Sequence, residues 1–578
     1  MEQVTVYIDK QPVQIEAGAT ILEAAKKAGV DIPTLCYLKE INAIGACRIC
    51  VVQVKGARSL QAACVTPVTK DMEVFTNTPA VRQARKLTLE LILSNHPKDC
   101  LTCIRNLNCE LQRLAESFGI RQMRFEGERT NYPNDTSTPS LVREPQKCIL
   151  CRRCVAVCEK VQTVKAIWPQ ERGFETVIDP AFHQPLMDVA CSLCGQCALV
   201  CPTAAIHERD QVHEVWAALA DPKKHVVVQT APAVRVSLGE YFGMEPGAIV
   251  TGKMVAALRR AGFDKVFDTD FTADLTIMEE GSELLARLAN GGTLPLITSC
   301  SPGWIKFIEH FYPELLPNLS TCKSPQQMFG ALAKTYYAQK TGIDPADIFV
   351  VSLMPCTAKK FEAQRPEMNS SGYTDVDVVL TTRELGRLLQ QVGIDWNTLP
   401  EEEYDAPLGI STGAGLIFGA SGGVMEAALR TAYELVTKED LKQIDFTAVR
   451  GLQGVKEAAI NMGGTTVKVA VTNGLGNARK VLDKIKAGEA DYHFVEVMCC
   501  PGGCIGGGGQ PIPTTEEIRN QRIGAIYTAD ERMTIRKSHH NPAVQALYQE
   551  FLEKPLGHKS HELLHTKYTP RGKFPEKA

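Results

Sequence analysis

Two cysteine runs in the first third of the chain decide what this part of it folds around. The first is CILCRRCVAVC (148–158) and the second is CSLCGQCALVCP (191–202). Each run spaces four cysteines by two, two and three residues, which lets thiolates wrap the corners of a four-iron cube. The pattern predicts two [4Fe–4S] clusters over residues 140–210, with two zinc knuckles as the alternative interpretation.

The same spacing also predicts which thiols share a cluster. In domains with two such runs, the fourth cysteine of each run binds the other cluster. The expected sets are therefore Cys148, Cys151, Cys154 and Cys201 for one cluster, and Cys191, Cys194, Cys197 and Cys158 for the other.

The residues that precede these runs carry two further groups of metal ligands. Residues 1–80 alternate apolar and polar side chains and resemble the [2Fe–2S] domain of plant-type ferredoxins, which implies a β-grasp fold. The thiols there are Cys36, Cys47, Cys50 and Cys64. Residues 81–125 start with a helical pattern and then hold His96, Cys100, Cys103 and Cys109. Zinc also takes three cysteines and a histidine, but the neighbouring clusters favour [4Fe–4S] for this group.

The remaining cysteines are scattered over the last 350 or so residues, where apolar strand-like runs alternate with helical stretches. These thiols are Cys300, Cys322, Cys356, Cys499, Cys500 and Cys504. Three of the strand-like runs, TLPLITSC, DIFVVSLMPC and HFVEVMCC, end on a turn that carries a cysteine. Strand ends are where α/β folds place ligands and catalysis, so we expect the chemistry there.

Composition excludes several classes of function. The chain has 578 residues and a formal net charge of -3, so several domains are expected, without the positive surface that nucleic acid or an anionic membrane would need. We find no leader-like N-terminus, no long apolar span and no GxGxxG after a strand. We therefore expect a soluble, cytoplasmic protein that binds no NAD or flavin itself. The 21 cysteines suit metal ions better than disulfides.

Three strings in the C-terminal part resemble the signature motifs of the [FeFe]-hydrogenase catalytic domain. They are TSCSPGW (298–304), MPCTAKKFE (354–362) and EVMCCPGGCIGGGGQP (496–511). The order of cluster domains resembles that of the large monomeric clostridial-type enzymes, and residues 535–568 resemble the small subunit of periplasmic members. The implied domains are 1–80, 81–125, 140–210, a two-lobed α/β domain at 222–530 and a small-subunit-like segment at 531–578.

The resemblance implies the reaction 2H⁺ + 2e⁻ ⇌ H₂ at an H-cluster. This cofactor is a [4Fe–4S] cube joined through a cysteine sulfur to a diiron unit with CO, cyanide and azadithiolate. One [2Fe–2S] and three accessory [4Fe–4S] clusters would exchange electrons with ferredoxin or a flavodoxin-type carrier. Two alternatives stay open: a subunit of an NAD(P)-linked, electron-bifurcating complex with flavoprotein subunits, and a hydrogenase-like sensory or assembly protein without H₂ turnover.

The resemblance also assigns roles to residues. Cys356, Cys500 and Cys504 would hold the cube, with Cys504 as the bridge to the diiron unit. The residues expected around the diiron unit are Ala231, Pro232 and Ala233 of a turn that ends at Arg235, with Gln326, Met354, Lys359, Phe418 and Met498. For the two methionines and the phenylalanine, ordinary core packing is the alternative.

The implied proton relay is Cys300, Glu280, Ser320, Glu283 and Arg287. Glu280, Glu283 and Arg287 share one face of an expected helix, and a solvated salt-bridge stripe is the alternative interpretation of that face.

One position departs from the family pattern. The first motif usually has two adjacent cysteines, the first for proton relay and the second as fourth ligand of the cube, but here Cys300 is followed by Ser301. Three outcomes are open: Cys300 takes the ligand role and Ser301 the relay, Ser301 binds an altered cube, or the site is defective. We prefer the first, because a serine hydroxyl holds its proton too tightly to be a good iron ligand. For Cys499 and Cys322 we expect buried packing.

Overall fold

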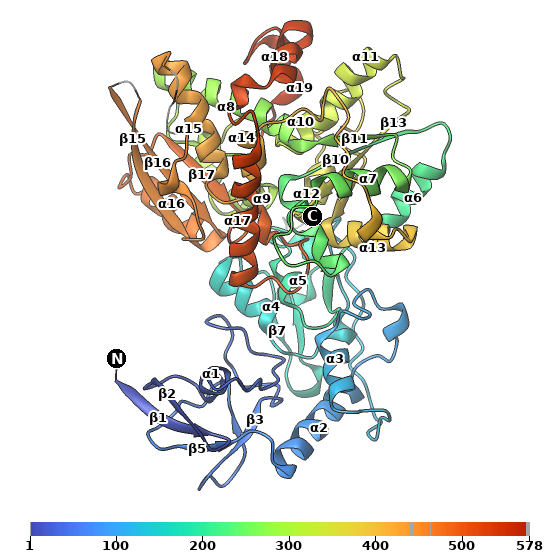
Figure 1. Cartoon of the computed structure of the whole chain (residues 1–578), viewed down its shortest axis with the longest axis vertical. Coiled ribbons are helices and arrows are strands. Elements are labelled where there is room, and N and C mark those ends of the chain that lie inside the picture. The colour runs from blue at the N-terminus through green and yellow to red at the C-terminus, as the bar shows by residue number, and fades with distance from the viewer. Residues whose placement is uncertain (1, 440, 442–443, 463, 574–578) are drawn as a thin grey trace.

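The chain places its parts in sequence order along the long axis of the molecule (Figure 1). The computed structural model describes residues 2–439, 441, 444–462 and 464–573. A small N-terminal sheet lies at one end, a cysteine-rich segment in the middle, and a large α/β part at the other end. Among the described residues, no helix is long and apolar enough to cross a membrane.

The N-terminal sheet has the strand order β2-β1-β5-β3-β4, with β1 and β5 parallel. Helix α1 packs on it through Ile21, Ala24 and Ala25, and begins with a capping box between Thr20 and Glu23. The bounds are β1 Gln3–Ile8, β2 Gln11–Glu16, α1 Ile21–Lys27, β3 Val51–Val54, β4 Gln61–Ala62 and β5 Glu73–Phe75.

The middle segment has little regular structure, because loops around cysteines replace most of it. Two short antiparallel pairs, β6 with β9 and β7 with β8, frame these loops. The bounds are α2 Pro79–Ser94, α3 Glu110–Ser117, β6 Leu141–Arg143, α4 Arg153–Ala156, β7 Trp168–Gln170, β8 Val177–Asp179, α5 Gln196–Val200 and β9 Ile206–Glu208.

The large part contains two four-stranded sheets, and its mixture of strands and helices is the α/β arrangement that its alternating pattern predicts. The first is parallel throughout in the order β11-β10-β13-β14, and the second has the order β12-β17-β16-β15 with only β15 antiparallel. Both are covered by helices, which explains why their central strands are continuous apolar runs. The strand bounds are β10 His225–Thr230, β11 Lys265–Asp268, β12 Leu296–Ile297, β13 Ile348–Met354, β14 Val378–Thr381, β15 Val455–Met462, β16 Thr465–Asn473 and β17 Phe494–Met498.

The helices of this part surround the two sheets (Figure 1). Their bounds are α6 Val212–Ala220, α7 Thr251–Ala261, α8 Thr269–Asn290, α9 Pro302–Phe311, α10 Pro325–Leu332, α11 Ala338–Thr341, α12 Ala358–Ala363, α13 Thr382–Val392, α14 Gly413–Leu416, α15 Gly423–Thr437, α16 Leu475–Lys486, α17 Glu516–Arg532, α18 Pro542–Leu547 and α19 His558–Leu564. The long helix α8 packs against α10, α14 and α15, and so contacts helices of both sheets.

The three motif loops follow the carboxyl ends of parallel strands. Strand β12 leads into Cys300, β13 into Cys356 and β17 into Cys499. Ala233, Phe418 and Met498 pack in one apolar cluster together with Cys300 and Cys504. The loops therefore meet in the interior rather than at the surface.

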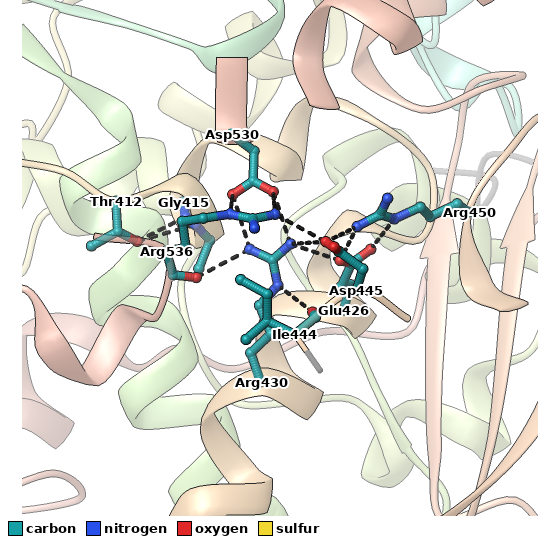
Figure 2. Close-up of polar contacts among 10 residues, drawn as sticks. Thr412, Gly415, Glu426, Arg430, Ile444, Asp445, Arg450, Asp530 and Arg536 are labelled. Carbon is teal, nitrogen blue, oxygen red and sulfur yellow. Dashed lines mark hydrogen bonds and ion pairs between the residues drawn. The ribbon is translucent and has the colours of Figure 1, made fainter. Parts of the chain in front are cut away.

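A buried ion-pair network fastens α17 to the rest of the large part (Figure 2). Arg430 of α15 is fully buried and contacts Glu426 at 2.7 Å and Asp530 of α17 at 2.9 Å. Arg536 and Arg450 extend the network to the same carboxylates. Each of these charges would be costly to bury alone, so the network requires all its members.

We expect Arg430→Met to destabilise the large part by about 3–5 kcal/mol, because the carboxylates of Glu426 and Asp530 lose a buried partner. The unfolding midpoint and hydrogen exchange in α15 and α17 measure the effect. Lys484→Met is the control, since Lys484 pairs with Glu457 on the surface. Equal protection of α15 and α17 in both variants would contradict the role of the network.

Candidate active site and cluster-binding sites

The two cysteine runs form two cavities that match the expected crossed sets. One is lined by Cys148, Cys151, Cys154 and Cys201, and the other by Cys158, Cys191, Cys194 and Cys197. The backbone N–H of Leu150 points at the sulfur of Cys148, and that of Leu193 at Cys191, each at 3.4 Å. Burial raises the pKa of both thiols to about 11, so an iron cluster would have to stabilise the thiolates.

The structure also brings together the two N-terminal ligand groups. Cys36, Cys47, Cys50 and Cys64 lie within one site, in which the sulfurs of Cys50 and Cys64 are 3.4 Å apart. A separate cavity is lined by His96, Cys100, Cys103 and Cys109. Burial lowers the pKa of His96 to about 4, which leaves a neutral imidazole available as a metal ligand.

Three thiols of the large part lie close enough to influence one another. Cys356, Cys500 and Cys504 come from two different motif loops. Burial raises the pKa of Cys504 to about 12, the charge of Cys500 adds to the rise, and Lys359 opposes it. Cys500 is buried and the other two are half-buried, and thiolates of this kind are the donors that bind an iron–sulfur cube.

Cys300 and Ser301 have different neighbours. Burial is the main cause that raises the pKa of the Cys300 thiol well above its usual range. The charges of Glu280 and Cys504 raise this pKa further, while Lys359 lowers it. Ser301 is instead the N-cap residue just before helix α9, and its hydroxyl accepts a hydrogen bond from the backbone N–H of Cys499 at 3.2 Å. Cys300 thus lies beside Glu280, whereas Ser301 lies beside Cys499.

The residues expected around a diiron unit are buried together. Lys359 is only 8% exposed, and its ammonium pairs with Glu362 at 2.8 Å. Gln326 donates to the same carboxylate, while its own side-chain oxygen has no partner among the described residues. Arg235 differs, because it turns to Asp268 at 2.7 Å and to Asp270 at 3.0 Å.

The glycines of the third motif let three segments come into contact. A Cβ on Gly507 would lie 2.1 Å from the carbonyl oxygen of Pro355, and one on Gly508 would lie 2.2 Å from that of Cys194. Any side chain there would force the second motif and the accessory cluster loop away from the third motif. Buried and half-buried thiols, a buried cation and this close approach together fit a bulky anionic iron cofactor.

The residues of the expected proton relay also meet. Glu280 and Glu283 of α8 are 2% and 9% exposed, so the solvated-stripe alternative is wrong for both. The Ser320 hydroxyl donates to Glu283 at 3.2 Å, and Ser320 also hydrogen-bonds Glu280. Arg287 pairs with Glu283 at 2.6 Å. Burial raises the pKa of Glu280 to about 8, which favours a proton on this carboxyl at neutral pH.

Sequence reasoning missed the residues that join the middle segment to the large part. Arg383 pairs with Glu208 at 2.7 Å, with both side chains buried. Gln162 donates to the carbonyl oxygen of Cys499 at 3.0 Å, and Gln196 to that of Gly506 at 2.9 Å. Each contact spans more than 170 positions in sequence and belongs to no motif, so no local pattern could have signalled it.

Models of known families match the chain over most of its length. Residues 224–508 match the iron only hydrogenase large subunit, C-terminal domain, and residues 516–571 match the iron hydrogenase small subunit. The N-terminal part matches a 2Fe-2S iron-sulfur cluster binding domain (1–79), the NADH-ubiquinone oxidoreductase-G iron-sulfur binding region (85–124) and a 4Fe-4S dicluster domain (147–205).

Individual relatives agree with these matches. The chain is 53% identical to the NADP-reducing hydrogenase subunit HndD of Solidesulfovibrio fructosivorans, over 99% of this chain and 100% of that one. It is 42% identical to iron hydrogenase 1 of Clostridium pasteurianum, over 98% and 99% of the two chains. An apo [FeFe]-hydrogenase variant from Chlamydomonas reinhardtii superposes with a TM-score of 0.57 at 48% identity, covering 63% of this chain and 100% of that one. The chain is thus a mixed α/β protein with iron–sulfur domains, and the relatives that it resembles are hydrogenases. It is an oxidoreductase and belongs to the [FeFe]-hydrogenase family.

Proposed function

We propose that the chain interconverts protons and H₂ at an H-cluster and exchanges the electrons with ferredoxin or a similar small carrier. The observation that carries this proposal is the meeting of three motif loops around Cys356, Cys500 and Cys504, with a buried acid relay on one side and the accessory cluster loop on the other. Protons and electrons thus have separate approaches to one buried site.

The finer organisation that we infer is the one expected from the sequence. It consists of one [2Fe–2S] cluster in a β-grasp domain (1–80), one His/Cys₃ cluster (81–125), two [4Fe–4S] clusters (140–210), a catalytic domain with two lobes (222–530) and a fused small-subunit-like segment (531–578). The two four-stranded sheets support the two lobes. The cysteine cavities support the accessory clusters.

The residues of the site would hold the cofactor mainly by packing and charge. When bound, its diiron unit supplies the metal chemistry of H₂ formation and cleavage. Lys359 offers a buried ammonium to an anionic ligand, which would replace part of its pairing with Glu362. Met354, Met498 and Phe418 offer apolar surface that excludes water.

The relay residues would move protons between the site and solvent. Glu280 can pass its proton to the Ser320 oxygen while Ser320 donates its own to Glu283, so that Glu283 gains a proton and Ser320 is unchanged. Arg287 then fixes the position of Glu283 near the surface. Cys300, on which the charge of Glu280 acts, would connect this relay to the cofactor. This role replaces the ligand role that we preferred for Cys300 from the sequence.

A second candidate function is that of the hydrogenase subunit in an NAD(P)-linked complex. The similarity to an NADP-reducing hydrogenase subunit favours it. Leu101 and Leu107 are more than 90% exposed beside Cys100 and Cys103, which suits a protein partner at the His/Cys₃ site. Such a partner would have to bring the flavin and nucleotide sites, since the sequence has no dinucleotide fingerprint.

We expect the chain, purified alone and supplied with a diiron precursor, to evolve H₂ from reduced ferredoxin and to show infrared bands of iron-bound CO and cyanide. NADPH alone should yield no H₂, because the sequence has no dinucleotide fingerprint. Cys504→Ala should abolish turnover, since it removes the proposed bridging thiolate, while the accessory clusters keep their electron paramagnetic resonance signals. Absent infrared bands in the parent protein would favour a sensory or assembly role, and NADPH-driven turnover would overturn the ferredoxin link.

We expect Glu280→Gln to lower H₂ turnover by about 10²–10⁴-fold, the usual contribution of a positioned acid or base. The pKa of Glu280 is raised to about 8 by burial, so its carboxyl is protonated at pH 7 and ionises as the pH rises through that value. The parent should show a change of turnover near pH 8 that the variant lacks. Glu457→Gln, a change at the surface pair, is the control. A variant with parental activity and pH profile would remove Glu280 from the relay.

A further inference from the structure

The proposed cube has three evident ligands and needs a fourth. Cys356, Cys500 and Cys504 lie together, and a four-iron cube usually takes four thiolates. The described residues nearby offer three candidates: Cys300, Ser301 and Cys499. The choice among them rests on the proposed function, but it concerns only the iron–sulfur cube and can be tested without H₂ turnover.

Separate arguments speak against Cys300 and Ser301 as the fourth ligand of the cube. The charges of Glu280 and Cys504 both act on the Cys300 thiol, so Cys300 lies between the proton relay and the proposed cube ligands and can connect the two. Ser301 would have to give up a proton that a hydroxyl holds far more tightly than a thiol does. Its oxygen already accepts the backbone N–H of Cys499 at 3.2 Å.

Cys499 has the surroundings that the other two lack. It is 3% exposed, and its thiol lies near the thiols of Cys194 and Cys500. Gly303 leaves the space that its sulfur fills, since a Cβ on this glycine would lie 2.7 Å from that sulfur. The chain bends at Cys499 and Cys500 after β17, so these consecutive side chains need not alternate as they would in a strand.

We propose that Cys499 provides the fourth thiolate of the cube, and that Ser301 serves only to hold the backbone of Cys499. On cluster binding the Cys499 thiol would release its proton and form a sulfur–iron bond, which needs no electron transfer. Cys194 is expected to bind the neighbouring accessory cluster. The Cys499 sulfur would then lie between the cube and this accessory cluster, and it would shorten the path that electrons take between them.

The test uses the full chain produced without diiron assembly, so that only iron–sulfur clusters are present. Anaerobic native mass spectrometry counts the clusters in Cys499→Ala, Ser301→Ala and Cys300→Ala. We expect only Cys499→Ala to lose the mass of one four-iron cluster and the corresponding resonance signal. A full complement in Cys499→Ala with loss in Cys300→Ala or Ser301→Ala would overturn the proposal.

A double variant guards against a simple packing defect. Cys499→Ala combined with Ser301→Cys returns a thiol to the neighbouring position, so it should regain the missing cluster. Cys322→Ala is the matched control, because Cys322 is also fully buried but lies by Glu283 and His565. If the double variant stays one cluster short while Cys322→Ala is complete, Cys499 acts through packing and the proposal fails.

A different observation carries a second inference, about the proton relay of the proposed function. The C-terminal segment places His565 against the relay, with 5% of its side chain exposed. Its Nδ1 lies 2.7 Å from the Thr321 hydroxyl, which in turn lies 3.2 Å from the Glu283 carboxylate. The exposed ring of His561 lies 4.3 Å from the His565 ring, between their centres.

The groups around His565 fix which of its nitrogens carries a proton. Its Nε2 lies 3.2 Å from Glu279, a carboxylate that already accepts hydrogen bonds from Tyr548 and from the backbone of Leu556. Nε2 must therefore donate, and the proton on Nδ1 is the one that can be exchanged. The other titratable groups that face the ring are Glu283 of α8, Cys322 and His561.

We infer that His565 is a second proton entry, which feeds Glu283 through Thr321. A protonated His565 gives its Nδ1 proton to the Thr321 oxygen while Thr321 gives its own proton to Glu283. The ring ends neutral, Glu283 ends protonated and Thr321 is unchanged. Arg287 pairs with the other oxygen of Glu283, so both contacts can exist together.

Imidazole rescue tests this entry. We expect Thr321→Val and His565→Ala to lower turnover by about tenfold with unchanged infrared bands, and added imidazole to restore only His565→Ala. His558→Ala, an exposed histidine on the same helix, is the control. Parental turnover in both variants, or loss in His565→Ala that imidazole does not restore, would overturn the inference. A parent without infrared bands would instead count against the proposed function.

Discussion

The arrangement of this protein depends on keeping ionisable thiols away from water. Most of the cysteines expected to bind iron are buried or half-buried, with Cys100 as an exposed member. Burial raises the pKa of thiols such as Cys148 and Cys504, so without a cation the folded chain would hold them protonated. The fold supplies rigid strand ends and tight loops for these groups, and iron would supply the charge that makes thiolates stable there.

The same constraint explains how the parts of the chain are joined. Electron transfer requires a short distance between neighbouring clusters. The backbone segments that hold these clusters must therefore come into contact with no side chain between them. Gly508 meets the carbonyl oxygen of Cys194, and Gln162 and Gln196 bind carbonyl oxygens of the third motif. The middle segment is thus held by its backbone geometry as much as by side-chain packing. The buried Arg383–Glu208 pair fixes the same junction electrostatically.

The sequence predicted the parts of this arrangement that local spacing controls. The crossed sets of Cys148 to Cys201 lie around two cavities, and the strand-like runs before Cys356 and Cys500 are strands β13 and β17. Motif resemblance, rather than periodicity, pointed to Lys359 and Glu280. Contacts between distant segments were out of reach, because nothing near His565 signals Thr321 and nothing near Cys499 signals Cys194. Arg235 ends the turn that carries Ala231, Pro232 and Ala233, and its ion pairs with Asp268 and Asp270 could not be read from the sequence.

The ion pairs of Figure 2 bear on whether the C-terminal region could be part of one chain or a separate subunit. Asp530 lies on α17 and Arg536 just beyond it, whereas Arg430 and Glu426 lie on α15 (Figure 2). The side chains of Arg430, Glu426 and Asp530 are fully buried, and that of Arg536 is partly exposed. A chain break before α17 would leave these contacts intact. The internal contact surface would then become an interface between two subunits. The two products would recognise each other by charges that neither could bury alone. Fusion and separation of this region are therefore structurally close alternatives, distinguished by one peptide connection rather than by a new interface.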